Sequence, residues 1–129
     1  MLNLRARNRT MEIRGATSHR KVDDMRVLKF IISGQTIQQD PSCDFSCLAP
    51  GTIGYLKAVF TFDEEWRGCA KIAEFRKYAS SEPSSERLIN DACMIPEQAL
   101  TGDKFYISVI GIKPGYRIKT NKLGVRQDG

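Results

Sequence analysis

The 129-residue chain has few of the residues that enzyme active sites require. Its only histidine, His19, lies in a segment with too few apolar residues to position it as the base that a nucleophilic cysteine or serine needs. No glycine-rich phosphate loop precedes a helical pattern. Asp63, Glu64 and Glu65 are adjacent in the sequence, so they project in different directions from a turn and do not form a catalytic pair. The sequence predicts a protein that is not an enzyme and has no cofactor.

Long hydrophobic runs are also missing. The longest apolar clusters, such as residues 106–112 (YISVIGI), have strand length and fall far short of the roughly 20 residues of a membrane helix. The arginine-rich N-terminus lacks the apolar segment and cleavage site of a secretory signal. We therefore expect no membrane partner, and synthesis in a reducing cytoplasm where thiols persist.

Four cysteines raise the question of a metal or redox site. Three residues separate Cys43 from Cys47 in the segment 40–47 (DPSCDFSC), whereas structural zinc sites usually use tighter Cys-x-x-Cys or Cys/His pairs. Cys69 and Cys93 are isolated on predicted strands. A zinc site with four thiolates and a disulfide between any two cysteines remain open. We favour four small, mostly buried residues, since free cysteine is among the most buried residue types.

The net charge of +5 comes from the N-terminus, because residues 1–21 hold six basic residues and one acidic residue while the rest carries 14 of each sign. Residues 1–24 are polar and lack periodicity, so we predict an extended basic arm. Met25 is an alternative natural start, which would make this arm an upstream extension. A neutral body argues against a dedicated nucleic-acid domain.

From Met25 onward, short runs of alternating polarity are separated by turn signals at a spacing of roughly 8–12 residues, which is typical of an antiparallel β-sandwich. Residues 25–129 are therefore predicted to be one all-β domain with seven or eight strands. A polar loop is expected at residues 80–86, and a helical turn that begins at Pro96. The expected strands are residues 26–32, 54–62, 69–78, two short pieces within 87–95, 104–112, and one or two strands within 116–127.

Aromatic residues are the candidate contact residues of the body. Tyr106 and Tyr116 fall on strand faces that alternation leaves open to solvent, and Trp66 follows an acidic turn. Such side chains stack on sugars or bury into a neighbouring subunit. For Trp66 the alternative is that its ring fills one end of the sandwich core.

Several segments together resemble a known group of proteins. They are MRVLKFIISGQTIQQDPSCDF, PGTIGYLKAVFTFDEEWRGCAKIAEFRK, ACMIPEQAL and KFYISVIGIKPGYRIKTNKLGVRQDG, which cover most of residues 25–129. This pattern resembles small structural proteins of Firmicute phages and prophages, and is similar to the N-terminal domain of upper baseplate or tail-fibre proteins. None of these segments is a catalytic motif, and residues 1–24 lie outside the resemblance.

The resemblance implies an immunoglobulin-like sandwich and a virion protein. The expected role is a tail or baseplate subunit, or a capsid decoration, head-fibre or adaptor subunit. Its partners would be other virion proteins and copies of itself, bound partly by the arm residues Arg5, Arg7 and Arg9. One alternative is a carbohydrate-binding module for host-surface glycans. Another is a protein associated with nucleic acid through its basic arm, whose binding falls steeply with salt.

Overall fold

The computed structural model describes residues 25–128, which form nine strands and two 3-10 turns. The strands are β1 (Arg26–Ser33), β2 (Thr36–Gln39), β3 (Leu56–Phe62), β4 (Ala70–Arg76), β5 (Ser84–Arg87), β6 (Ala92–Met94), β7 (Lys104–Lys113), β8 (Tyr116–Lys119) and β9 (Leu123–Arg126), and the turns are η2 (Glu64–Trp66) and η3 (Glu97–Ala99). No helix in this part of the chain is long and apolar enough to cross a membrane.

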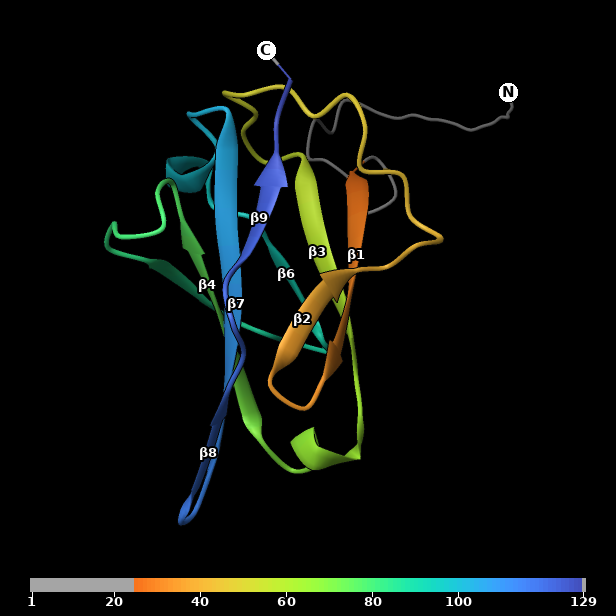
Figure 1. Ribbon diagram of the computed structural model, residues 1–129, viewed down its shortest axis with the longest axis vertical. Helices are drawn as coiled ribbons and strands as arrows, with labels where there is room; N and C mark the ends of the chain where they lie inside the picture. The colour runs from red at the N-terminus through yellow and green to blue at the C-terminus, as the bar shows by residue number, and fades with distance from the viewer. Residues whose placement is uncertain (1–24, 129) are drawn as a thin grey trace, which may run out of the picture.

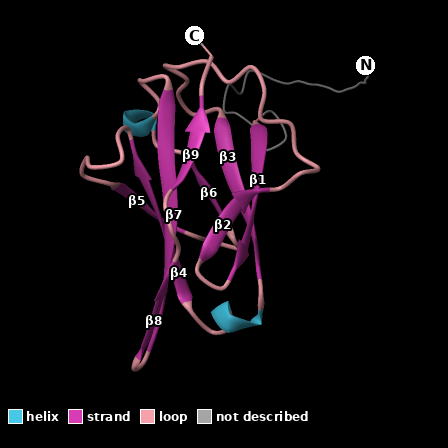
Figure 2. Ribbon diagram, in the orientation of Figure 1, coloured by secondary structure: helices cyan, strands magenta, loops and turns pink. Residues whose placement is uncertain are grey.

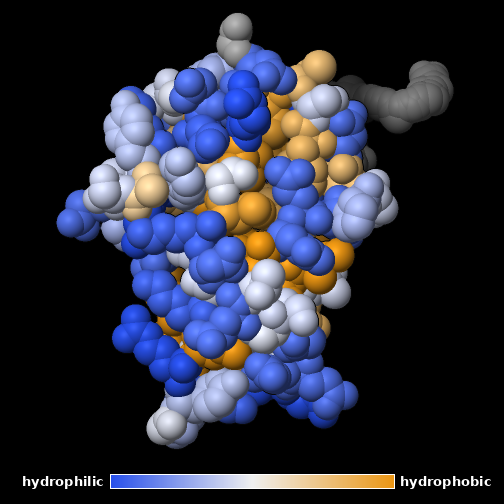
Figure 3. All heavy atoms as spheres, in the orientation of Figure 1, coloured by the Kyte–Doolittle hydropathy of each residue, from blue (hydrophilic) through white to orange (hydrophobic). Residues whose placement is uncertain are grey.

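The strands form two sheets that pack face to face (Figures 1 and 2), which confirms the predicted β-sandwich. The first sheet has the order β2-β1-β3-β6 and the second the order β5-β4-β7-β8, with β9 also paired to β7. Whether the sandwich is immunoglobulin-like stays a prediction. In Figure 3 hydrophilic side chains cover most of the visible surface, and hydrophobic residues show mainly in a central band.

The core follows the alternation of the sequence. Every second residue of a strand faces the opposite sheet, and those positions are apolar in β1, β3 and β7. Leu28, Phe30 and Phe60 are at most 3% exposed, and the rings of the two phenylalanines stack with centroids 5.5 Å apart. Burial of these side chains is the main stabilisation of the sandwich.

One strand pair departs from the predicted antiparallel pattern. β1 and β3 run parallel, with Phe30 beside Phe60 and Leu28 beside Ala58. After β1 the chain turns back through β2, and residues 40–55 return it to the end of the sheet where β1 begins. The sequence does not reveal this pairing, because the same alternation suits a parallel or an antiparallel neighbour.

Two short edge strands were also not expected. The predicted loop at residues 80–86 is wrong for Ser84–Glu86, which pair with β4 as part of β5. β2 likewise pairs with β1 at residues that carried no strand signal. Apart from the buried Ile37, both segments are polar. Main-chain pairing rather than side-chain propensity therefore determines the structure of these edge strands.

The remaining expectations at the turns are confirmed in outline. The helical turn near Pro96 is η3, with Pro96 just before its first residue. The last strand is in two parts, β8 and β9, on the same side of β7. Between them, the Asn121 backbone donates to the Gln35 carbonyl (3.0 Å), and its side-chain oxygen accepts from the backbone N–H of Ile37 (3.0 Å). Asn121 therefore joins the second sheet to the edge of the first.

Candidate functional site

The outer face of the second sheet concentrates positive charge. The strand register places Ile72 opposite Ile110, Ile110 opposite Lys119, and Tyr106 opposite Gly124 on the side away from the core. The same alternation gives this face one acidic residue, Glu74, and six basic residues. The basic residues are Arg76, Arg87, Lys104, Arg117, Lys119 and Arg126. The near neutrality of the body therefore does not extend to this surface.

Three isoleucines lie on this basic face toward the end where β7 pairs with β8, and we call Ile72, Ile110 and Ile112 the isoleucine patch. Ile112 is 43% exposed. Ile110 is only 6% exposed although it lies outside the core cluster, so its cover comes from neighbours on the outer face. Basic residues lie opposite all three isoleucines: Arg87, Lys119 and Arg117. The patch thus combines apolar surface with a cationic border.

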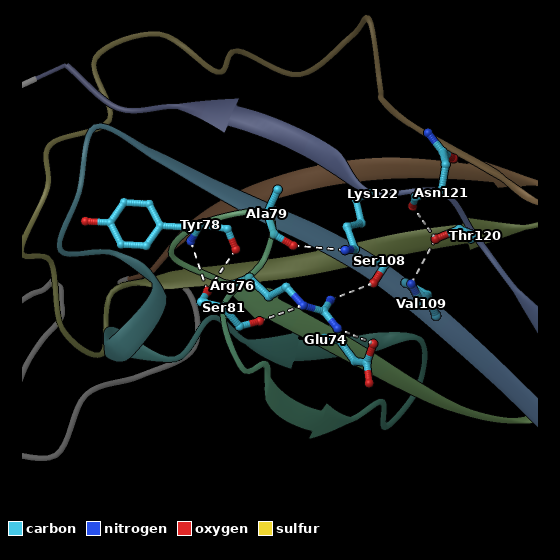
Figure 4. A network of polar contacts seen from close by, with 10 residues as sticks. All are labelled: Glu74, Arg76, Tyr78, Ala79, Ser81, Ser108, Val109, Thr120, Asn121 and Lys122. Carbon is cyan, nitrogen blue, oxygen red and sulfur yellow. Dashed lines mark hydrogen bonds and ion pairs between the residues drawn. The ribbon is translucent and has the colours of Figure 1, made fainter.

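A polar network covers the middle of the same face (Figure 4). Arg76 donates from Nε to the Ser81 carbonyl (3.1 Å) and from Nη1 to the Ser108 hydroxyl (3.4 Å). Its Nη2 lies 3.4 Å from Glu74 Oε1, and both side chains are at most 15% exposed. This network holds the chain after β4 against the sheet.

A second contact fixes that chain segment from the other side. Lys122, between β8 and β9, donates from Nζ to the Ala79 carbonyl (2.9 Å). Ser81 also accepts from the Tyr78 backbone N–H (3.1 Å) through its hydroxyl, which in turn donates to the Tyr78 carbonyl (2.8 Å). In Figure 4 the Tyr78 ring points away from this network, and it is 60% exposed.

Between this segment and the start of β7 lies a cavity of about 310 Å³, which we call the tyrosine cavity. Its lining combines three basic residues, two tyrosines and one aspartate: Lys77, Lys104, Arg126, Tyr78, Tyr106 and Asp103. Of the three predicted contact residues within residues 25–128, only Tyr106 lies in this lining.

Two glycines lie beneath side chains that line the tyrosine cavity. A Cβ on Gly124 would lie 3.2 Å from Tyr106 Cε2 and 3.2 Å from Lys104 Cδ, so only a glycine lets both side chains lie undisturbed across β9. On the other side, the Lys77 stem lies over Gly102, where a Cβ would be 3.5 Å from Lys77 Cε. Gly124 and Gly102 therefore each leave room for side chains that line the cavity.

Trp66 lies inside the core, which is the second of the two positions predicted for it from the sequence. Its side chain is 0% exposed, and Nε1 donates to the Gly34 carbonyl (2.9 Å). A Cβ on Gly111 of β7 would lie 2.7 Å from Trp66 Cε3, so the ring packs directly on that backbone. With no exposed surface, Trp66 does not serve as a contact residue, which corrects that expectation.

Tyr116 has a structural contact as well as some free surface. Its hydroxyl donates to the Glu65 carbonyl (3.1 Å), and Lys113 Nζ lies 4.6 Å from the centroid of its ring. Lys113 also donates to the Arg67 carbonyl (3.1 Å). Tyr116 is 37% exposed and lies away from the tyrosine cavity, so the structure does not bring it together with Tyr106.

A second cavity, of about 230 Å³, lies near η2. An ion pair lies in its wall, since Lys71 Nζ is 3.0 Å from Asp91 Oδ1. Lys71 also lies over the Phe62 ring, 4.4 Å from its centroid. The charged groups of this cavity are thus already in contact with one another, and it is the weaker candidate for a ligand.

The segment 40–47 is a loop of two similar turns. Asp40 Oδ1 accepts from the backbone N–H (2.9 Å) and hydroxyl (2.8 Å) of Ser42, and Asp44 Oδ1 accepts likewise from Ser46. The pKa of Asp40 is lowered mainly by the hydrogen bond from the Ser42 backbone N–H, and to a smaller extent by that from the Ser42 hydroxyl. The pKa of Asp44 is also lowered, and there the Ser46 hydroxyl is the larger cause. Their carboxylates are therefore bound within the loop.

The cysteines are free and more exposed than predicted. Cys47 is exposed, whereas Cys43, Cys69 and Cys93 are partly buried. Burial, with a smaller contribution from the charge of Glu86, raises the pKa of Cys93 to about 12. Among residues 25–128, no group of three His, Cys, Asp or Glu side chains lies close enough together to hold a metal ion.

The predicted arm and its candidates Arg5, Arg7 and Arg9 lie outside the described residues. Four lining residues of the tyrosine cavity were not predicted, because the excess positive charge had been assigned to the N-terminal arm: Lys77, Tyr78, Lys104 and Arg126. The sequence did contain a signal for one of these four residues, since Lys104 and Tyr106 are two residues apart on one strand and so share its face.

No family model, curated protein or solved structure matches this chain.

Proposed function

We propose that the protein is a non-enzymatic structural protein of a bacteriophage virion that acts by binding its neighbours. Its place is the tail, the baseplate or the capsid surface, and its partners are other virion proteins and further copies of this chain. In this proposal the sandwich is of the immunoglobulin-like type implied by the sequence resemblance. The chain is made in the cytoplasm of the bacterial host and then joins the particle.

The observation that carries the proposal is the isoleucine patch with its basic border. Protein interfaces typically combine an apolar centre with a polar rim in which arginine is enriched. Ile112 supplies exposed apolar surface, and Arg117 and Lys119 lie beside it on β8. Because the patch lies on paired strands, its side chains need little reordering on contact, which lowers the entropic cost of binding.

The test is quantitative mass spectrometry of phage particles purified from a bacterium that produces the protein. We expect the chain to remain with the particles through density-gradient purification, in a fixed ratio to the major capsid protein. Particles that contain none of it would contradict the proposal.

A second candidate function, the binding of glycans, is favoured by the tyrosine cavity. Tyr106 and Tyr78 bring two aromatic rings to one small cavity, and aromatic rings combine apolar faces with a polar edge suited to sugars. Glycan binding and virion assembly use different parts of the outer face, so they are tested separately.

A further inference from the structure

We propose that the tyrosine cavity binds a sugar that carries a negative charge, as a carboxylate or a phosphate group. This inference rests on the second candidate function and specifies its ligand class. It does not depend on the virion proposal, because the isoleucine patch lies lower on the same face and shares no residue with the cavity.

The cations of the cavity support the charge of the ligand. Lys77, Lys104 and Arg126 form no ion pair with any carboxylate of residues 25–128. Lys104 and Arg126 are also direct neighbours across β7 and β9. Like charges placed opposite each other destabilise a sheet. A bound anion would relieve this repulsion, so the arrangement favours a negatively charged ligand.

The tyrosines supply the surface for the sugar ring. Lys104 Nζ lies 5.9 Å from the centroid of the Tyr106 ring, and Lys77 Nζ lies 5.3 Å from that of Tyr78. Each ring therefore lies beside a positive charge. A sugar that packs against one of these rings would place an acidic substituent within reach of the adjacent ammonium group.

Asp103 argues for a sugar rather than nucleic acid. Its carboxylate lines the cavity, where it can accept hydrogen bonds from hydroxyl groups. A nucleic-acid strand would bring several phosphates past this carboxylate, whereas an acidic sugar brings a single charged group, which can lie at the cations of the cavity. The volume of about 310 Å³ is at the lower end of the range for ligand pockets, which suits a small ligand.

The experiment is an NMR titration of the full chain with glucuronate, glucose 6-phosphate and glucose, following backbone amide resonances. We expect the two charged sugars to shift the resonances of Lys104, Tyr106 and Gly124, and to bind roughly tenfold more tightly than glucose. The charged sugar with the higher affinity identifies the preferred acidic group. Arg126→Gln should weaken the binding of both charged sugars by roughly tenfold and should weaken the binding of glucose by much less.

Arg67→Gln is the matched control, since Arg67 lies beside η2 at the other end of the sandwich with 77% of its side chain exposed. Its affinities should equal those of the wild type. Equal binding of glucose and the charged sugars would overturn the charge preference and leave glycan binding standing. No shift with any of the three sugars would overturn both. Tighter binding of a single-stranded oligonucleotide, lost in Arg126→Gln, would overturn the inference in favour of nucleic acid.

Discussion

Two aromatic side chains lie over glycines on opposite faces of the second sheet, and the two contacts have different consequences for the molecule. Trp66 packs on Gly111 inside the sandwich and is 0% exposed, while Tyr106 lies across Gly124 on the outer face and lines a cavity. Each glycine leaves room that a Cβ would fill. The inner pair completes the core, and the outer pair shapes a surface that a ligand can reach.

The contacts around the two rings explain this difference. The Trp66 ring has Phe62 beside it, with centroids 5.2 Å apart, and its only polar atom is bonded to Gly34. Tyr106 instead lies among cations that have no ion-pair partner within residues 25–128. Substitutions at the inner pair should therefore change stability, and those at the outer pair should change binding.

The largest effect is expected from Trp66→Ala. Removal of a fully buried indole leaves a cavity and takes away the hydrogen-bond donor of the Gly34 carbonyl. We expect a loss of about 3–5 kcal/mol in the free energy of unfolding, measured by urea denaturation followed by circular dichroism. A loss below about 1 kcal/mol, the range of surface substitutions, would show that Trp66 does not complete the core.

Gly111→Ala should have the next largest effect. The added Cβ would lie 2.7 and 2.8 Å from two atoms of the Trp66 ring and 3.0 Å from Ile118 Cγ2, so the ring must move. Overpacking of this kind costs about 1–3 kcal/mol. Because Trp66 is the only tryptophan, its fluorescence reports the shift directly. An unchanged emission spectrum and an unchanged unfolding free energy would contradict this account of the inner pair.

Gly124→Ala is the outer counterpart and should change stability by less than about 0.5 kcal/mol. Its Cβ would meet the ends of flexible side chains, at 3.2 Å from both Tyr106 and Lys104, and these can move outward into solvent. We expect the Tyr106 ring resonances to shift and the affinity for glucuronate to fall. If instead Gly124→Ala destabilises the chain as much as Gly111→Ala, the distinction between the two pairs fails.

The last prediction needs no substitution, because the reactivity of the native cysteine thiols distinguishes the surface from the interior. At mildly alkaline pH, Cys47 should react first with Ellman's reagent, because it is exposed, and Cys93 last. The pKa of Cys93 is raised from 9.0 to about 12, so the folded state keeps this thiol neutral after the unfolded chain would lose the proton. Its contribution to stability is thus present below about pH 9 and is lost as the pH rises toward 12.

Mass spectrometry of the modified peptides identifies which thiol has reacted. Full reaction of Cys93 before denaturant is added, at the rate of Cys47, would contradict the burial of β6 against the core.

The sequence was sufficient to predict the sandwich, because alternating apolar residues in β1, β3 and β7 determine which faces are buried. It did not predict the parallel pairing of β1 and β3 or the polar edge strands β2 and β5. Those features depend on which strands become neighbours, and the residues of Ser84–Arg87 carry no local preference for a strand.

The candidate site was predicted only in part for the same reason. Tyr106 was identified from its position on one strand, but three of the residues around it come from two other segments of the chain. Lys77 follows β4 and Arg126 ends β9, and only the register of the sheet brings them beside Lys104. Trp66 was the opposite case, since a single tryptophan after an acidic turn suits a surface or a core position equally well.

A competition for incorporation into particles tests the proposal that the outer face of the second sheet binds a neighbour in the virion. Wild-type chain would be produced together with tagged Ile112→Glu or tagged Ile89→Glu, and the ratio of the two forms measured in purified particles. Ile89 is 72% exposed and lies outside the isoleucine patch, so it is the matched control. We expect Ile89→Glu to enter particles as the wild type does, and Ile112→Glu to be depleted at least about tenfold. Equal incorporation of both variants would contradict it.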